Sequence, residues 1–278
     1  MEQKDKDIFE QTTKFNTGIK LYMFQTGTIK TKIKFIKMNQ GEEPFEIPVP
    51  WFLIKHPKGD IIIDGGMPIE TAIDKHKHWG SVIEAYDPVM KKSEWCRDQI
   101  KTVNTNPEDI KYVIQTHLHL DHSGAIGHFP NATHITQRLE YDYAFNPDWF
   151  SQPAYIREDF DKPNIRWKFL QGRKTDFYDV HGDGVIKIIF TPGHTPGHQS
   201  VLVNLPKTGH MLFTGDACYT EDHWCDKCLP GLVASSSDAA ESVSKLRKVA
   251  KEHEATVVWG HDPISWKIWK KAPMFYYD

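Results

Sequence analysis

The sequence predicts an α+β protein in which two β-sheets pack together with helices on the outside. Strand-like segments dominate the chain, and the helix-like segments fall between groups of strands. The 278 residues suffice for one large domain with a sizeable core, and neither an internal repeat nor a low-complexity linker divides them. We therefore expect a single domain over residues 1–278.

The expected strands are rich in Val, Ile and Phe and are bounded by Gly, Pro or Asn. They are Ile19–Phe24, Ile33–Met38, Trp51–Lys55, Asp60–Asp64, Tyr112–Gln115, His134–Thr136, Val185–Phe190, Ser200–Asn204, Met211–Thr214 and Thr256–Trp259. Helices are expected at Glu94–Val103, Arg138–Phe145 and Asp238–Glu254, and the last begins with a serine run that suits a helix N-cap. Residues 65–110 and 141–183 are polar, aromatic and interrupted by proline, which indicates two insertions.

Composition excludes several classes of protein. The net charge of -3 gives no basic field for nucleic acid. Residues 1–17 are polar, without an apolar signal core, and no run approaches a membrane span, so we expect a cytoplasmic protein that binds neither nucleic acid nor membranes. Four cysteines are too few for a disulfide scaffold, and the pair Cys225 and Cys228 lacks the second pair of a zinc ribbon. We expect that pair to be structural or incidental.

One hexapeptide, H-L-H-L-D-H, places three imidazoles and a carboxylate directly after an apolar strand-like run. In an extended segment His117 and His119 project to the same side, and Asp121 continues that side. His122 turns away as Ser123–Gly124 signals a change of direction. Neutral imidazole suits zinc, and a carboxylate can complete the site or bridge to a second metal. The hexapeptide therefore predicts a metal site.

Four predicted strands each end in a metal-capable side chain, namely His117, His194, Asp216 and His261. If these strand ends meet at one edge, the protein presents seven ligands there, which suit two metals sharing a bridge rather than one tetrahedral zinc. Asp216 is the expected bridge, because the other six then divide into two equal sets. They are a first triad of His117, His119 and His194 and a second triad of Asp121, His122 and His261.

Together with the segment Asp60–Gly66, these ligands resemble the metallo-β-lactamase superfamily, and the resemblance covers nearly the whole chain. It implies a four-layer αβ/βα sandwich with the metals at the open edge of the two sheets. It also implies that Asp64, in the acidic turn at a strand end, supports the metal ligands from behind. Because the superfamily hosts many reactions, the fold leaves the substrate open.

Shorter motifs resemble the N-acyl homoserine lactonases, the quorum-quenching members of the superfamily. They are Pro48–Leu53, Gly66–Pro68, Thr191–Ser200, Asp216–Thr220 and Gly260–Asp262. The resemblance implies a small lactone substrate, a homodimer and two zinc ions per chain, although the same ligands would accept other divalent metals. In the lactonases a tyrosine at the position of Tyr219 contacts the lactone carbonyl, which makes Tyr219 a candidate catalytic residue.

The expected reaction is opening of the lactone ring by a metal-bridging hydroxide, because zinc lowers the pKa of bound water to ~7. The metal of the first triad polarises the carbonyl, while Tyr219 stabilises the developing oxyanion. The metal of the second triad stabilises the leaving alkoxide. Asp121, the second candidate catalytic residue, carries the proton to that oxygen.

Other members of the superfamily compete with this interpretation. True β-lactamases lack the last histidine of the motif and use a cysteine ligand, whereas His122 is present here and Cys218 is offset from Asp216. Glyoxalase-II-like thioesterases share all seven ligands and remain the alternative, together with other lactone or ester hydrolases. They usually add a basic helical extension, whereas this chain ends about 17 residues after His261. Nucleases of the superfamily would need a basic surface.

The acyl tail of such a substrate needs an apolar groove, which the insertions could supply. The candidate residues are Met67, Phe145, Trp149, Phe150 and Tyr155. The same side chains could instead cover the core beneath the insertions, so the acyl-chain preference stays open. Two nearby imidazoles, His76 and His78, are expected at the surface.

Overall fold

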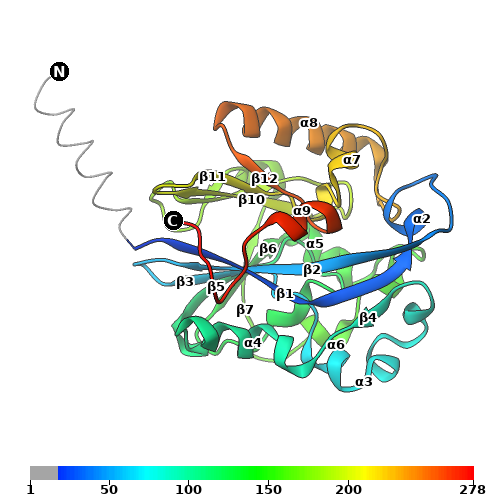
Figure 1. The fold of residues 1–278 in the computed structure, drawn as a ribbon, viewed down its shortest axis with the longest axis horizontal. Helices are drawn as coiled ribbons and strands as arrows, with labels where there is room; N and C mark the ends of the chain where they lie inside the picture. Colours follow the sequence, from blue (N-terminus) through cyan, green and yellow to red (C-terminus); the bar gives the residue numbers. More distant parts are fainter. Residues whose placement is uncertain (1–17) are drawn as a thin grey trace, which may run out of the picture.

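The computed structural model describes residues 18–278 and contains two β-sheets packed face to face, with helices on their outer sides (Figure 1). This arrangement confirms the predicted α+β class and the layered sandwich. The polar segment 1–17, in which the sequence shows no signal core, lies outside the described residues. Across residues 18–278, none of the helices has the length and apolar character needed to cross a membrane.

The larger sheet has seven strands. They are β1 (Lys20–Lys32), β2 (Pro44–Lys55), β3 (Asp60–Ile63), β4 (Asp87–Val89), β5 (Ile110–Ile114), β6 (Thr133–Gln137) and β7 (Arg166–Leu170), in the spatial order β4-β1-β2-β3-β5-β6-β7. Strands β3, β5, β6 and β7 run parallel to one another. The carboxyl ends of parallel strands meet at one edge of a sheet. The residues that follow β3, β5 and β6, among them Asp64, His117 and Glu140, therefore gather at that edge.

The smaller sheet has five strands. They are β8 (Tyr178–Asp179), β9 (Ile186–Phe190), β10 (Gln199–Leu205), β11 (Gly209–Phe213) and β12 (Thr256–Val258), in the spatial order β12-β11-β10-β9-β8. Because β10 pairs antiparallel with both β9 and β11, and β11 pairs parallel with β12, strands β9, β11 and β12 share one direction. Their carboxyl ends carry His194, Asp216 and His261 to the same edge.

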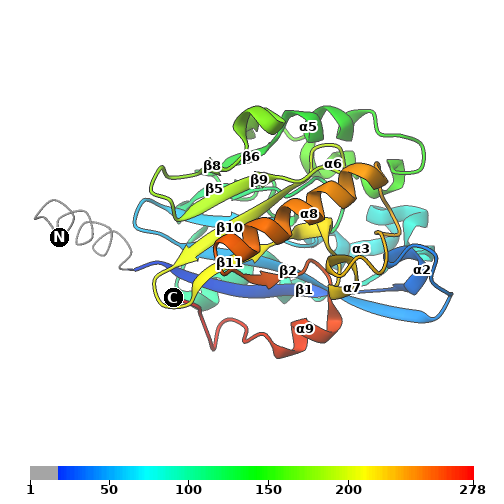
Figure 2. The same cartoon turned by 90° about the horizontal axis from the view of Figure 1, so that it is seen from above.

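Helices cover both sheets. They are α2 (Ile33–Ile36), α3 (Ile69–Trp79), α4 (Cys96–Gln99), α5 (Arg138–Phe145), α6 (Arg157–Phe160), α7 (Glu221–Trp224), α8 (Ser236–Glu252) and α9 (Pro263–Ile268). Figure 2 shows α8 lying across β10 and β11. Its N-cap is Ser235, whose side chain accepts a hydrogen bond from Asp238 N, and the helix packs Leu246 and Val249 on the sheet.

The main core lies between the two sheets. Phe52 of β2 contacts Phe213 of β11 there, with ring centroids 4.4 Å apart. Ile54, Ile63 and Val201 are buried in the same cluster. This apolar layer holds the two sheets together, so that the strand ends that carry the polar side chains keep a fixed separation.

One predicted element is wrong in the structure, and another is right over most of its length. Segment Ile33–Met38 is not a strand, because α2 interrupts the hairpin of β1 and β2 and buries Ile36, one helical turn after Ile33. The helix predicted at Glu94–Val103 is confirmed over residues 96–103, where α4 continues into the 3₁₀ turn Ile100–Val103, but the extended backbone of Trp95 (ψ 134°) separates Glu94 from it. The helix at Arg138–Phe145 is confirmed.

The two insertions carry strands that the sequence did not indicate. The first contains β4, which lies at one edge of the larger sheet. The second contains β7, at the opposite edge of that sheet, and β8, at an edge of the smaller sheet. Edge strands are short and need no apolar alternation on both faces, so they leave little trace in the sequence.

Candidate metal centre

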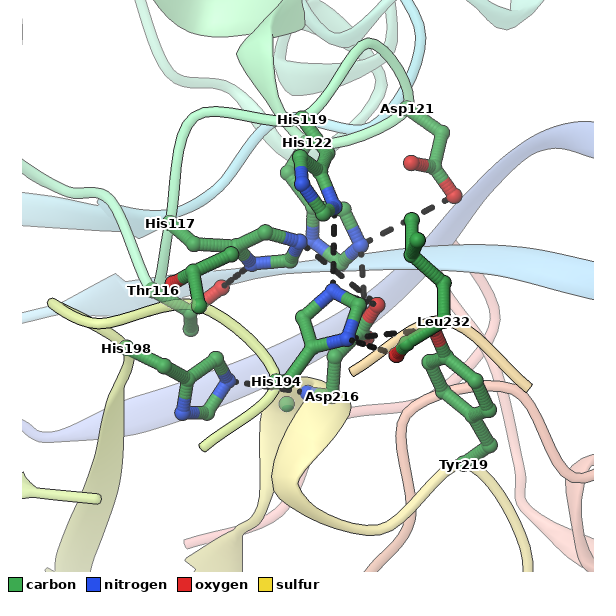
Figure 3. A network of polar contacts seen from close by, with 12 residues as sticks. Thr116, His117, His119, Asp121, His122, His194, His198, Asp216, Tyr219 and Leu232 are labelled. Carbon is green, nitrogen blue, oxygen red and sulfur yellow. Dashed lines mark hydrogen bonds and ion pairs between the residues drawn. The ribbon is translucent and has the colours of Figure 1, made fainter. Parts of the chain in front are cut away.

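All seven predicted ligands lie together at the shared edge of the two sheets. Figure 3 labels six of them, all except His261. The seven ligands form two groups. One consists of the first triad and Asp216, and the other consists of the second triad. Within each group the potential ligand atoms lie within 4.8 Å of one another. The division into two sets is the one that the sequence predicts.

Asp216 faces both triads with separate oxygens. Its Oδ2 lies 3.5 Å from His117 Nε2 and 3.3 Å from His194 Nε2. Its Oδ1 lies 3.4 Å from His122 Nε2 and 3.1 Å from His261 Nε2. A carboxylate between two ions would present its oxygens in this way.

Several buried polar atoms in this cluster have no hydrogen-bond partner. They include His117 Nε2, His119 Nε2 and Asp216 Oδ1. Pairs of imidazole nitrogens also face each other. His194 Nε2 lies 3.0 Å from His119 Nδ1, and His122 Nε2 lies 3.3 Å from His261 Nε2. Buried groups without partners are costly unless a cation engages them. The residues therefore fit two divalent metal ions.

Four of the imidazoles are held by a hydrogen bond from Nδ1, on the side away from the cluster. The acceptors are Thr116 Oγ1 for His117 at 3.0 Å, Asp64 Oδ2 for His122 at 2.9 Å, Leu232 O for His194 at 2.9 Å and Pro48 O for His261 at 2.8 Å. Because these oxygens accept, the proton sits on Nδ1 and the lone pair of Nε2 is free to bind a metal.

Asp64 connects the larger sheet to both triads. Its carboxylate accepts hydrogen bonds from the amide N (2.7 Å) and the hydroxyl (2.9 Å) of Thr116. The same carboxylate accepts from His122 Nδ1, and the Thr116 hydroxyl accepts from His117. Asp64 itself has a left-handed backbone (φ 65°), which brings its side chain back under the cluster. This is the supporting position that the resemblance implies.

Burial and charge set the protonation of the cluster. Burial lowers the pKa of His117 and of His119 well below the usual range, so both imidazoles are neutral. Burial also works against ionisation of Asp216, but His261 and His122 outweigh it and hold the pKa of that carboxyl well below its ordinary value. Burial also opposes protonation of His122 and His261, but Asp216 outweighs it and raises the pKa of both imidazoles, so a metal ion would have to displace a proton from each of them.

Two buried residues that sequence reasoning missed also position the ligands. His198 Nε2 accepts from the amide N of Asp216 at 3.0 Å, and its Nδ1 lies 3.1 Å from Thr191 O. Burial lowers the pKa of His198 to about 3, so its ring is neutral. The signal was available, because His194 and His198 stand in a repeated T-P-G-H motif.

Glu140 of α5 is the second buried residue that sequence reasoning missed. It is fully buried and accepts hydrogen bonds from Leu118 N at 3.0 Å, Tyr155 Oη at 3.1 Å and Thr195 Oγ1 at 2.5 Å. The carboxylate thus ties the hexapeptide segment to the loop of His194. No motif in the sequence marks this residue.

A cavity of about 430 Å³ opens beside the two triads. Asp121, Asp216 and Tyr219 contribute to its wall. The apolar side chains of the hairpin and α2 that line it are Ile29, Phe35, Ile36 and Ile47. Val82, Ala85 and Tyr86, from the 3₁₀ turn Gly80–Glu84 and the residues after it, close another side.

Of the five predicted substrate residues, the structure places Phe150 on the cavity wall. The other four do not line the cavity. Met67 is fully buried in the core, and the ring of Phe145 packs on that of Phe160, with centroids 5.4 Å apart. Trp149 is 85% exposed, and Tyr155 is buried between Glu140 and the ring of His119. Phe145 and Tyr155 cover the core, which is the second interpretation that the sequence left open, whereas Trp149 neither covers the core nor lines the cavity.

The prediction for the two nearby imidazoles is half right. His76 is exposed. His78 is not, because its side chain is only 6% exposed and its Nε2 lies 3.1 Å from Asp159 Oδ1. Cys225 and Cys228 are free thiols, as are the other two cysteines.

Comparison with known proteins agrees with this geometry. Residues 45–261 match the family model of the metallo-beta-lactamase superfamily. The N-acyl homoserine lactonase AttM of Rhizobium radiobacter is 59% identical over 261 residues, which are 94% of this chain and 99% of that protein. An N-acyl homoserine lactonase of Bacillus cereus is 34% identical over 221 residues, 78% of this chain and 82% of the relative.

A solved structure of an N-acyl homoserine lactone hydrolase, with the product N-hexanoyl-L-homoserine bound at its catalytic metal centre, has a similar fold. Its TM-score is 0.81 at 27% sequence identity, and the match covers 92% of this chain and 98% of that one. The fold, the two facing triads and the family match agree. This chain belongs to the metallo-β-lactamase superfamily, in the branch that contains the AttM-type N-acyl homoserine lactonases.

Proposed function

We propose that this protein is a two-zinc hydrolase that opens the lactone ring of N-acyl homoserine lactones. The observation that carries the proposal is the place of Tyr219. Its ring centroid lies 5.4 Å from that of His194 and 5.6 Å from that of His261, so the phenol stands beside both triads on the cavity wall. The 59% identity to AttM and the product bound in the similar hydrolase support the same substrate class.

The metal is proposed from the chemistry of the donors. Five imidazoles and two carboxylates suit zinc, with one triad for each ion and Asp216 between them. When bound, the two ions supply Lewis acidity and make water available as a nucleophile near neutral pH. The protein contributes the fixed imidazole orientations and a low-dielectric site, both of which strengthen electrostatic interactions with the substrate.

Tyr219 is proposed to stabilise the charge that develops on the lactone carbonyl oxygen. Burial and the nearby Asp216 raise the pKa of the Tyr219 hydroxyl well above its usual value, so it keeps its proton at neutral pH. A protonated phenol can donate a hydrogen bond to an oxyanion, and a preorganised donor of this kind stabilises the transition state more than the ground state.

Asp121 is proposed to deliver the proton to the ring oxygen as it leaves. Its Oδ2 lies 3.6 Å from His261 Nε2 and 3.7 Å from His122 Nε2, at the edge of the second triad. The side chain is 13% exposed and lines the cavity, so substrate can reach it. A carboxylate in contact with both the metal ligands and the substrate space can hold a proton at that point.

The acyl tail is proposed to lie on the apolar wall of the cavity rather than on the aromatic insertion. Ile29 and Ile47 of the hairpin and Phe35 of α2 form that wall. An aliphatic chain in contact with them leaves water, which favours binding by roughly 0.8 kcal/mol for each buried methylene group.

The test compares two substrates on one purified preparation. Metal analysis should give about two zinc ions per chain, and N-hexanoyl homoserine lactone should be hydrolysed far faster than S-lactoylglutathione. Each ring opening releases a carboxylic acid, so proton release under weak buffering measures the rate. One ion per chain, or efficient thioester hydrolysis without lactone hydrolysis, would overturn the proposal. Light scattering on the same preparation tests the homodimer.

A further inference from the structure

The wall of the cavity carries one half-buried polar side chain that neither the metal scheme nor Tyr219 accounts for. Apart from the ligands and Tyr219, the polar side chains that line the cavity are those of Ser81 and Tyr86. Ser81 is exposed to solvent. Among the described residues, Tyr86 therefore presents a second sheltered hydroxyl to the cavity, next to the apolar side chains Phe35, Val82 and Ala85.

The local structure fixes the position of this hydroxyl. Tyr86 follows the turn Gly80–Glu84, and its amide N donates to Val82 O at 2.9 Å. Its ring packs against that of Phe35, with centroids 5.5 Å apart. Its Oη donates to Phe35 O at 3.3 Å. The ring is thus held between the turn and α2.

The hydroxyl hydrogen points at the backbone of α2, which leaves the lone pairs of the oxygen free. Burial raises the pKa of the Tyr86 phenol, and Asp121 and Asp216 raise it further, so the group stays protonated. Tyr86 lines the same cavity as Asp121, Asp216 and Tyr219, so its ring borders the space beside the two triads. The free face of Tyr86 Oη can therefore act as a hydrogen-bond acceptor inside the cavity.

An N-acyl homoserine lactone carries one strong donor, the amide N–H beside the ring. When the ring sits at the triads and the tail on the apolar wall, that N–H leaves water and needs a new acceptor. We propose that Tyr86 Oη accepts this N–H and thereby makes the cavity selective for N-acylated lactones over lactones whose tail is attached without a donor. This inference rests on the proposed function and identifies what selects its substrate.

The experiment compares N-hexanoyl homoserine lactone with its ester isostere, in which oxygen replaces the amide N–H. Tyr86→Phe keeps the ring and removes the acceptor. For the amide substrate kcat/KM should fall about tenfold, mainly through KM, because one neutral hydrogen bond is worth roughly a factor of ten. For the ester isostere kcat/KM should stay within about twofold of the unmodified protein, since no N–H is lost there.

A binding measurement separates recognition from turnover. The ring-opened product, N-hexanoyl homoserine, should bind to Tyr86→Phe about tenfold more weakly, whereas its O-acyl analogue should bind unchanged. The matched control is Tyr112→Phe, whose phenol contacts His181 and does not line the cavity. This control should leave both substrates and both products unaffected.

Three results would overturn the inference. An equal loss on amide and ester would show that Tyr86 only shapes the wall, and no loss on either would show that its oxygen does not meet the amide. If the unmodified protein opens neither lactone, the proposed function fails and this inference fails with it. If the unmodified protein opens both lactones and Tyr86→Phe leaves kcat/KM unchanged for both, only the inference fails.

Discussion

The carboxylate of Asp64 accepts a hydrogen bond from His122 Nδ1 at 2.9 Å, and through Thr116 it also orients His117. One side chain of the larger sheet thus orients an imidazole in each triad. The carboxylate reaches both because Asp64 directly follows β3 and has a left-handed backbone, next to the parallel strand that leads to Thr116. Asp64 therefore supports one imidazole of each proposed metal position.

Replacing Asp64 by asparagine should weaken metal binding by roughly 10- to 100-fold. Asparagine tolerates the left-handed backbone, so the turn survives, but its amide offers one acceptor oxygen where Thr116 and His122 need two. Competition against a chromophoric chelator measures the affinity. Hydrolysis should fall at limiting zinc and recover at excess zinc.

The control for this substitution is Asp60→Asn at the other end of β3. Asp60 accepts from His56 N at 3.0 Å and contacts no metal ligand. Its replacement should leave zinc affinity unchanged. If Asp64→Asn also binds zinc as tightly as the unmodified protein, the supporting role of Asp64 is wrong.

Replacing Tyr219 by phenylalanine should lower kcat for lactone opening by roughly 100-fold, because a preorganised donor to the developing oxyanion is lost. The Tyr219 hydroxyl lies 3.2 Å from His194 Nδ1, so zinc content must be measured on the same sample. If the variant holds two zinc ions per chain and its kcat is low, the loss of activity arises in the reaction itself and not from loss of metal. An unchanged kcat would remove Tyr219 from the mechanism.

Replacing Glu140 by alanine should destabilise the fold by about 3 kcal/mol or more. The substitution leaves the donors Leu118 N, Thr195 Oγ1 and Tyr155 Oη without their buried acceptor, and each unsatisfied donor costs roughly 1–3 kcal/mol. Urea denaturation measures the change.

Glutamine at position 140 keeps an acceptor oxygen and the side-chain volume, so it should lose clearly less stability than alanine. If the two substitutions cost the same, the three hydrogen bonds contribute little.

The clustering of the proposed metal ligands could be predicted from the sequence because their residue types are typical of metal sites. Histidine and aspartate rarely follow buried strands without a reason, and parallel strands bring such positions to one edge. His117, Asp216 and His261 each stand directly after an apolar run. Both the composition and the place of each ligand therefore pointed to the same site.

The cavity wall could not be predicted in the same way. Ile29, Ile47 and Phe35 have the composition of ordinary core residues, and nothing local distinguishes an apolar side chain that faces a cavity from one that faces a neighbour. Their exposure to the cavity depends on how the hairpin tip and α2 lie against the turn before Tyr86. The sequence instead predicted a substrate contact at Trp149, which is exposed, because aromatic side chains in an insertion suggest a ligand site.

The buried imidazole of His134 predicts how the stability of the fold depends on pH. It is 1% exposed on β6, its Nδ1 has no partner, and burial, aided by the charges of Lys162 and His128, lowers its pKa to about 3. In the unfolded chain its pKa is ~6.5. Between these values the unfolded state binds a proton that the folded state does not, so the free energy of unfolding falls as the pH falls, by up to about 1.4 kcal/mol per unit.

Replacing His134 by glutamine should make that dependence shallower. Glutamine does not titrate, and its oxygen can replace the Nε2 that accepts from Gly127 N. Urea unfolding of both proteins at pH 7.5, 6.5, 5.5 and 4.5 gives the difference in unfolding free energy, and any loss of metal in acid common to both cancels from it. The difference should be constant above pH 6.5 and move in favour of the variant below it. His76→Gln, at an exposed position, should show no such trend. A constant difference down to pH 4.5 would mean that His134 binds its proton equally well in the folded and unfolded states.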